Sequence, residues 1–240
     1  MIEFLAETGS TNADLLERVR RGDRVSEGSW LVADRQLAGK GRQGRAWFDG
    51  AGNFMGSTMV EVRPSDPAPA SLALVAGLAV YETVISMVGE PGAIALKWPN
   101  DVLMRGAKLA GILLEREGDI IVVGIGVNLA KAPELPDRET IALSASGPAP
   151  DRDQFANSLA RQFDTELERW RTFGLAPLIR RWELAAHRHG TLLHVQPPGE
   201  QPIKGAFAGL DQTGALQLRL SDGEVKVIHA GDVMLAREEG

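Results

Sequence analysis

The residues with the clearest chemical potential lie at positions 39–45, GKGRQGR, which hold three cations and no acid. The whole chain has 26 Lys and Arg in 240 residues, so cations are several times denser here than on average. Glycine lets backbone N–H groups approach an anion closely, and the cations add charge-assisted hydrogen bonds to it. The segment therefore predicts an anion-binding loop; the alternative is a flexible, solvated loop without a ligand.

The glycine spacing of this loop also matches the GxGxxG pattern of dinucleotide-binding folds. That pattern requires a helix to open directly after it, whereas residues 47–53, WFDGAGN, are not a helix start. A P-loop is excluded as well, because Arg45 stands where that motif needs Lys and Ala46 where it needs Ser or Thr. The anion-binding prediction therefore depends on local charge and glycine content alone.

Three later motifs place charged or glycine residues in short predicted strands. Residues 97–101, KWPND, end a strand with Lys and Trp, which suits either a plain turn or a pocket for a polar ligand. Residues 108–113, KLAGIL, begin an apolar strand with Lys, which is either an edge charge or a half-buried ammonium facing a carboxylate or phosphate. The glycines of residues 124–128, GIGVN, indicate either a bulge or the close approach of a ligand or backbone.

Several common chemistries are excluded. The chain has no Cys, which removes disulfides, zinc–thiolate sites, thiol nucleophiles and CxxC redox motifs. Its four His form no HExxH pattern, so we expect no metal held by protein ligands. No GxSxG motif is present, and Ser10, Ser57 and Ser144 have no evident triad partner.

Charge and hydropathy exclude two classes of partner. The formal net charge is −6, whereas binding to nucleic acid or to an anionic membrane usually shows as a basic excess. The N-terminus carries acids where a signal peptide needs a basic start. The most apolar stretch, residues 68–88, is interrupted by Glu82 and predicts a buried helix rather than a membrane span. We therefore expect a cytoplasmic protein.

Hydrophobic periodicity predicts the elements that must position these motifs. Alternating or short apolar runs predict strands at residues 2–6, 30–33, 54–62, 95–98, 102–104, 109–115 and 120–127. Helical spacing predicts helices that begin near Thr11 and end near Gly22, and at residues 72–88, 155–173 and 176–186. Thr11 as the N-cap residue and Asp14 three positions later form a capping-box pattern. The Pro-rich residues 131–151 predict a loop.

The last fifty residues have a different character. Short alternating runs at residues 192–195, 203–207, 215–220 and 224–228 are separated by Gly- and Pro-containing turns. This pattern predicts a small β-barrel. We therefore divide the chain into residues 1–189 and residues 190–240.

The motifs, in this order, resemble the catalytic region of the biotin–protein ligases. The matching stretches are residues 10–12 (STN), 36–47, 97–101, 108–113 and 124–128. The tail resembles the small SH3-like barrel of that family. The resemblance implies an α+β fold, in which a mixed or antiparallel sheet packs with helices as in class II aminoacyl-tRNA synthetases, followed by an SH3-like C-terminal barrel.

The resemblance implies a two-step reaction. Biotin and MgATP give biotinyl-5′-AMP and pyrophosphate, and a lysine of a biotin carboxyl carrier domain then attacks the mixed anhydride and releases AMP. Two alternatives stay open: a lipoate or octanoate ligase or transferase of the same superfamily, and a biotin-binding module without catalysis. The chain is expected to act as a monomer or homodimer.

The resemblance also assigns roles to individual residues. For biotin it implies Ser10, Thr11, Asn12, Gln36, Gly39, Lys40, Gly41, Arg42, Lys108, Gly111, Gly124 and Gly126. For the nucleotide it implies Arg42, Arg45, Trp47, Lys97, Asn100, Lys108 and Asn128. For catalysis it implies Lys108, Arg42, Arg45, Lys97 and Asp101. Mg²⁺ is expected to arrive with ATP, and whether Asp101 serves as a base for the carrier lysine is left open.

Two departures from the family pattern stand out. The family often shows GRGRRGR, where this chain has Lys40 and Gln43 at two Arg positions. Lysine keeps the charge but not the bidentate fork, so retention of the adenylate is expected to differ. Some family members also carry an N-terminal DNA-binding helix-turn-helix, and we expect none here because the first catalytic strand starts at Ile2.

Overall fold

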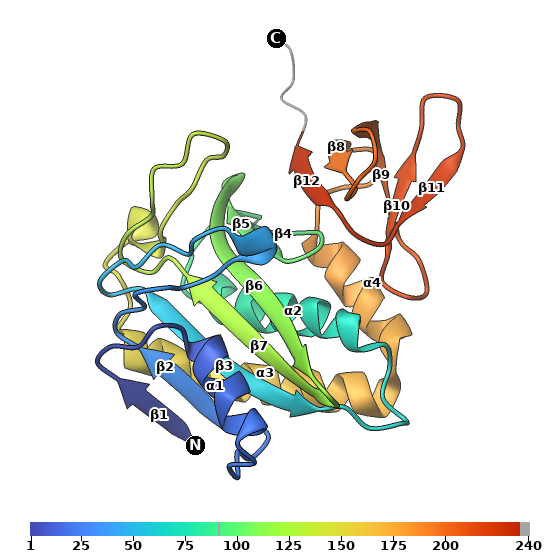
Figure 1. The fold of residues 1–240 in the computed structure, drawn as a ribbon. Coiled ribbons are helices and arrows are strands. Elements are labelled where there is room, and N and C mark those ends of the chain that lie inside the picture. The colour runs from blue at the N-terminus through green and yellow to red at the C-terminus, as the bar shows by residue number, and fades with distance from the viewer. Residues whose placement is uncertain (91, 236–240) are drawn as a thin grey trace.

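Two β-sheets organise the computed structural model, which describes residues 1–90 and 92–235. The larger has seven strands in the order β1-β2-β3-β7-β6-β5-β4 (Figure 1). Its strands are β1 (Ile2–Leu5), β2 (Trp30–Ala33), β3 (Phe54–Glu61), β4 (Ile94–Lys97), β5 (Asp101–Met104), β6 (Ala107–Glu117) and β7 (Ile120–Val127). All seven match the predicted strands to within a few residues.

The pairing of these strands confirms a mixed sheet. β1 and β2 run parallel, and every later pair is antiparallel. Tight turns join β4 to β5, β5 to β6 and β6 to β7. The β5–β6 turn has two successive residues with positive φ, Arg105 at 51° and Gly106 at 81°, as a two-residue hairpin turn requires.

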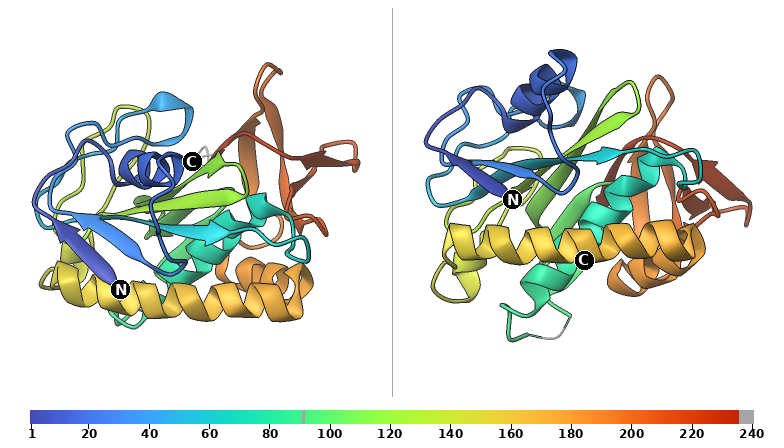
Figure 2. Two further views of the ribbon diagram at one scale, coloured as in Figure 1. Left: turned by 60° about the horizontal axis from the view of Figure 1, so that its bottom comes forward. Right: turned by 90° about the horizontal axis from the view of Figure 1, so that it is seen from below.

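Helices cover both faces of this sheet (Figure 2). On one face lies α1 (Thr11–Arg20), which buries a small cluster formed by Leu15, Leu16, Leu31, Met59 and Val122. The other face carries α2 (Leu72–Ile85), α3 (Arg152–Phe173) and α4 (Leu175–Ala185). Among the described residues, no helix is both long and apolar enough to cross a bilayer.

The start of α1 differs from the predicted capping box. Ser10, not Thr11, is the N-cap residue, and its hydroxyl accepts a hydrogen bond from the backbone N–H of Ala13 at 3.5 Å. Asp14 accepts from the Thr8 hydroxyl instead of closing a box. The one-residue shift places Thr11 and Asn12 in the first turn of the helix, where both are buried.

The smaller sheet is antiparallel, in the order β11-β10-β9-β8-β12. Its strands are β8 (Leu192–Gln196), β9 (Ile203–Leu210), β10 (Leu216–Arg219), β11 (Val225–Ile228) and β12 (Asp232–Leu235). The proposed division at residue 190 falls in the link between α4 and β8. Residues 236–240 of the predicted small domain lie outside the described residues. One hydrophobic cluster runs through both sheets, so the smaller sheet packs directly on the larger unit.

A buried ion pair joins α3 to α4 and gives a test of stability. The Glu166 side chain is fully buried and accepts from Arg169 at 2.8 Å and from Arg181 at 2.9 Å. Arg181→Ala leaves this carboxylate underpaired, and we expect a loss of about 3 kcal/mol in the free energy of unfolding, measured by urea denaturation. Arg180→Ala, an exposed arginine on the same helix, is the control. Equal losses in both variants would refute the role of the pair.

Candidate active site

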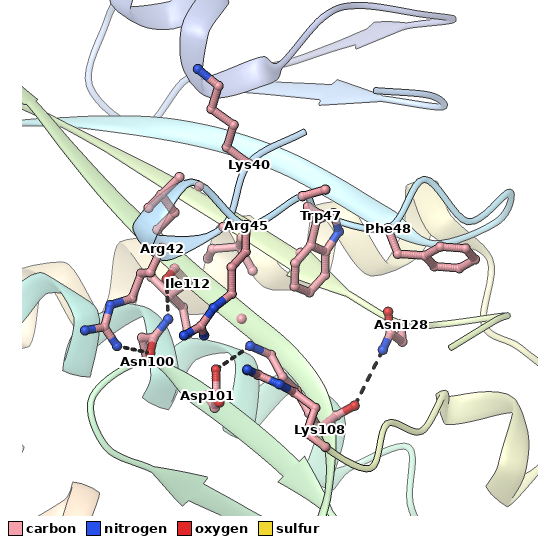
Figure 3. A pocket seen from close by; sticks show the side chains of 18 of the residues that line it. Lys40, Arg42, Arg45, Trp47, Phe48, Asn100, Asp101, Lys108, Ile112 and Asn128 are labelled. Atoms are coloured by element: carbon pink, nitrogen blue, oxygen red, sulfur yellow. Dashed lines mark hydrogen bonds and ion pairs between the residues drawn. The ribbon is translucent and has the colours of Figure 1, made fainter. Parts of the chain in front are cut away.

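A cavity of about 700 Å³ lies between the larger sheet and the start of β12. Its walls come from the first turn of α1, residues 36–48, the β4–β5 turn and strands β6 and β7. Residues 133–138 and 232–234 complete it. Figure 3 shows Arg42, Arg45, Asp101 and Lys108 gathered on one side of the cavity.

All but one of the predicted site residues line this cavity. Those present are Ser10, Thr11, Asn12, Gln36, Lys40, Gly41, Arg42, Arg45, Trp47, Lys97, Asn100, Asp101, Lys108, Gly111, Gly124, Gly126 and Asn128. Gly39 is buried behind the wall, where an added Cβ would lie 3.0 Å from Gln36 and 3.4 Å from Trp47. Lys40 reaches the rim, but its side chain is exposed and its ammonium points away from the other cations (Figure 3).

The centre of the cationic side is Asp101, which is held between two lysines. Its Oδ1 lies 2.6 Å from Lys108 Nζ and its Oδ2 lies 3.0 Å from Lys97 Nζ. Burial alone would raise the pKa of the Asp101 carboxyl, but the two ammonium groups outweigh it and lower that pKa to about 2. A carboxylate with so low a pKa is a poor proton acceptor. Asp101 therefore fixes the positions of two cations, and the geometry disfavours it as a general base.

The surroundings of Lys108 decide between its two predicted settings. β6 lies between β5 and β7, so Lys108 is not an edge charge. Its side chain is only 17% exposed, and its ammonium stands 5.8 Å from the centroid of the Trp47 ring. Of the two predicted alternatives, an edge charge or a half-buried ammonium that faces a carboxylate or phosphate, the structure shows the second.

The arginine loop folds as a narrow hairpin. Lys40 and Ala46 pair across it, and a turn at Arg42–Gly44 forms its tip. The arginine side chains reach to the smaller sheet, where Arg45 pairs with Asp232. Arg42 donates to the Asn100 side chain at 3.0 Å and to the backbone carbonyl of Gly231 at 3.2 Å. The smaller sheet therefore holds the loop over the cavity.

The glycines of β6 and β7 make room for side chains that pack directly against the strand backbone. Pairing of β7 with both neighbours is regular from residue 120 to 127, so the predicted alternative of a bulge is wrong. A Cβ on Gly126 would lie 2.2 Å from the Trp47 ring, and one on Gly124 would lie 2.3 Å from Asn12 Oδ1. Trp47 also covers Gly111, where the corresponding distance is 3.1 Å. Close approach is the reason that these positions need glycine.

A chain of polar side chains forms the opposite wall. Gln36 Oε1 accepts from the Thr11 backbone N–H at 2.8 Å, and the Thr11 hydroxyl lies 2.6 Å from that of Ser57. Ser57 donates to Asn12 Oδ1 at 2.6 Å, and Asn12 Nδ2 donates to Glu115 at 2.8 Å. All these groups except Glu115 line the cavity. The wall is therefore an organised set of donors and acceptors for a small polar group.

Two buried polar atoms at the cavity have no partner in the described part of the chain. They are Asn128 Oδ1 and Trp47 Nε1. Asn128 is 2% exposed and its Nδ2 donates to the Ile141 carbonyl at 3.2 Å, which fixes the free oxygen in place. An unpaired buried acceptor is costly, so this oxygen is suited to a ligand that brings an N–H or O–H donor.

Sequence reasoning missed several residues of the cavity. Ser57 was considered only as a nucleophile, yet it links Thr11 to Asn12. Asp232 lies in β12, a short strand that was not predicted, and Asp137 and Arg138 lie in a segment predicted only as loop. The apolar run of residues 233–235, which follows a bend in the chain, was the available signal for β12.

The described residues contain no cluster of side chains that could hold a metal ion. Across residues 1–90 and 92–235, no three His, Asp or Glu side chains are arranged to hold a metal ion. The carboxylates at the cavity each face a cation: Asp101 two lysines, Asp137 the guanidinium of Arg138, and Asp232 that of Arg45.

A half-buried histidine, whose pKa is influenced by the charge of Lys97, gives a pH test of the same region. His187 follows the end of α4; burial, and secondarily the charge of Lys97, lower its pKa from 6.5 to about 4. Between these values the unfolded chain binds more protons, so the free energy of unfolding falls as pH falls from 6.5 to 4. We expect His187→Gln to flatten this dependence in urea titrations at pH 7, 5.5 and 4.5. Exposed His229→Gln is the control, and parallel wild-type and His187→Gln curves would contradict the assignment.

Family models match both parts of the chain. The biotin/lipoate A/B protein ligase family matches residues 5–130, and the biotin protein ligase C terminal domain matches residues 195–235. A biotin–[acetyl-CoA-carboxylase] ligase of Paracoccus denitrificans is 38% identical over 96% of this chain and 98% of its own. One of Mycobacterium tuberculosis is 39% identical over 98% of this chain and 89% of its own. The bifunctional ligase/repressor BirA of Escherichia coli is 34% identical over 99% of this chain and 75% of its own.

Solved structures agree with these relatives. The biotin protein ligase from Aquifex aeolicus in complex with biotin and ATP has a TM-score of 0.85 and 29% identity, over 98% of both chains. The enzyme from Leishmania major in complex with biotinyl-5-AMP has a TM-score of 0.66 and 26% identity, over 95% of this chain and 98% of its own. With matches in both parts and along nearly its whole length, the chain belongs to the biotin/lipoate A/B protein ligase family and, within it, to the biotin protein ligases.

Proposed function

We propose that this enzyme activates biotin with ATP to biotinyl-5′-AMP and transfers biotin to a lysine of a biotin carboxyl carrier protein or domain. The observation that carries the proposal is one cavity with two unlike walls. One wall holds Lys97 and Lys108 around Asp101, and the other is the polar chain that begins at Gln36. Such a cavity suits one substrate that is anionic at one end and polar but neutral at the other. The absence of Cys fits a reducing compartment, and we propose that the reaction takes place in the cytoplasm.

In the first step, the biotin carboxylate attacks the α-phosphorus of ATP, and the bond to the pyrophosphate oxygen breaks. Two anions repel one another on this path, so cations fixed beforehand at the reacting centre lower the barrier. We assign Lys108 the contact with both the carboxylate and the phosphate; its ion pair with Asp101 and its position beside Trp47 support this role because they fix the ammonium in the cavity. The arginines of the loop supply further positive charge toward the phosphates. No protein nucleophile is required.

Mg²⁺ would be held mainly by the triphosphate, since each carboxylate at the cavity already faces a cation. When bound, the ion neutralises negative charge on the departing pyrophosphate. Asn128 offers its unpaired oxygen to a donor of the nucleotide, which agrees with the role expected for it.

In the second step, a carrier lysine amine attacks the carbonyl of the mixed anhydride, forming the amide and releasing AMP. The carrier must reach the cavity from solvent. Phe48, Leu135 and Met234 line the cavity and are 36%, 43% and 56% exposed, so they mark the side on which it opens. Their apolar side chains provide a surface on which the lysine-bearing turn of a carrier can rest.

The assay that tests the proposal uses labelled biotin or lipoate, ATP and an apo carrier domain. We expect label from biotin on the carrier lysine, dependent on ATP, and none from lipoate. Transfer of lipoate alone would establish the lipoate-ligase alternative instead.

A second measurement separates an enzyme from a binding module. We expect biotin-dependent exchange of labelled pyrophosphate into ATP, because adenylation is reversible. Tight biotin binding without any exchange would identify a non-catalytic module.

A further inference from the structure

Two glutamates of β6 hold the two ends of α1. Glu115 accepts from Asn12 Nδ2 at 2.8 Å in the first turn of the helix, and Glu117 pairs with Arg20 at 2.8 Å in its last turn. The glutamates are two residues apart, so they project from the same face of the strand. They differ in one respect: Asn12 lines the cavity, whereas Arg20 does not. Glu115 thus contacts the site only through Asn12.

The Glu115 carboxylate decides which way the Asn12 amide faces. An ionised carboxylate only accepts hydrogen bonds, so the atom of Asn12 that faces it must be the amide nitrogen. The amide oxygen must then face Ser57, whose hydroxyl lies 2.6 Å away. Ser57 therefore gives its single hydroxyl hydrogen to Asn12.

The orientation of the Asn12 amide also sets the directions of the other hydrogen bonds in the wall. Three oxygen–oxygen contacts connect Asn12 to Ser57, Ser57 to Thr11 and Thr11 to Gln36, at 2.6, 2.6 and 3.0 Å. Only two hydroxyl hydrogens are available for these three contacts. With Ser57 committed to Asn12, the Thr11 hydroxyl can donate either to Ser57 at 2.6 Å or to Gln36 at 3.0 Å. Two oxygens only 2.6 Å apart need a hydrogen between them, so we assign the Thr11 hydrogen to Ser57 and leave the longer contact, to Gln36, without one.

The wall consequently presents acceptors at its Thr11–Gln36 end. Thr11 Oγ1 has given its hydrogen to Ser57, and Gln36 Oε1 is held by the Thr11 backbone N–H and keeps a lone pair. The ureido ring of biotin carries N–H donors that match these acceptors. If the Asn12 amide turned over, each hydrogen would shift one place and Thr11 would donate to Gln36, so both acceptors would be filled.

We propose that Glu115 is a positioning residue for biotin, because it fixes the Asn12 amide and thereby the donor–acceptor polarity of the wall that receives the ureido ring. This proposal rests on the proposed function, which names biotin as the substrate. The proposal concerns affinity for biotin and not for ATP, since none of the hydrogen-bonded residues from Glu115 to Gln36 belongs to the cationic wall.

Glu115→Gln tests the polarity and not the packing. Glutamine fills the same space but offers either an oxygen or an amide nitrogen to Asn12, so it no longer fixes the amide. We expect about tenfold weaker biotin binding by calorimetry, with unchanged ATP binding and thermal unfolding within the range of the control. The matched control is Glu117→Gln on the same strand and the same helix, which should bind biotin like the wild type. Equal weakening in both variants, or wild-type affinity in Glu115→Gln, overturns the proposal.

A double-mutant cycle with Asn12→Ala checks that Glu115 acts through Asn12. In the Asn12→Ala background, Glu115→Gln should change biotin affinity no further. Additive losses would overturn the proposal. Absence of biotin binding by the wild-type protein would instead refute the proposed function, so the two failures are distinguishable.

Discussion

Lys108→Ala reduces biotin-dependent pyrophosphate exchange by about 10²–10³-fold, the effect of removing one fixed charge or donor from a reacting centre. Lys108 is the cation most firmly placed there, since its ammonium is bound to Asp101 at 2.6 Å and stands beside the Trp47 ring. A flexible surface lysine would contribute far less, because it would have to be ordered during the reaction. Exchange kinetics at varied biotin and ATP should show the loss mainly in kcat.

Two further variants make this result specific. Lys108→Arg keeps the charge but not the compact ammonium, so its rate should lie between those of the wild type and Lys108→Ala. Lys131→Ala removes a cation that does not line the cavity and should exchange like the wild type. Near-normal exchange by Lys108→Ala would show that the role assigned to this residue is wrong.

Local patterns in the sequence predicted most of the fold. All seven strands of the larger sheet and all four helices appear close to their predicted residues, because each contains an apolar run or stripe that packs into a hydrophobic cluster. β12 was not predicted because its sequence, DVML, is one acid followed by three apolar residues and does not alternate polar with apolar side chains. The N-cap residue of α1 was displaced by one position, since Ser10 and Thr11 are chemically equivalent as caps.

Most residues that line the cavity were predictable from motifs, but their contacts were not. Whether Lys108 lay at an edge or inside the sheet depended on the strand order, which local sequence does not encode. The partners of the polar and charged groups are likewise distant along the chain. Asn12 meets Glu115, and Arg45 meets Asp232, across gaps of 103 and 187 residues. For that reason Glu115 and Asp232 could not be named from motifs.

Arg42 carries the other large expected effect, because it is the loop cation whose position is set by most partners. One arm of its guanidinium donates to Asn100 and the other to the Gly231 carbonyl, with Asp232 3.7 Å away. These contacts hold a planar, always-charged fork at the mouth of the cationic wall, where bidentate binding of a phosphate is possible. Nucleotide binding would exchange some of these protein partners for phosphate oxygens.

We therefore expect Arg42→Ala to lower exchange by about 10²-fold and to raise the KM for ATP more than the KM for biotin. Arg42→Lys should recover only part of the rate, since lysine keeps the charge but loses the fork. Arg116→Ala, an exposed arginine of β6 that pairs with Asp119 outside the cavity, controls for the loss of a surface cation. If Arg42→Ala and Arg116→Ala exchange alike, phosphate is held by other groups. A rise in the KM for biotin alone would instead move Arg42 to the biotin side of the cavity, because a cation that contacts only the carboxylate leaves ATP binding unchanged.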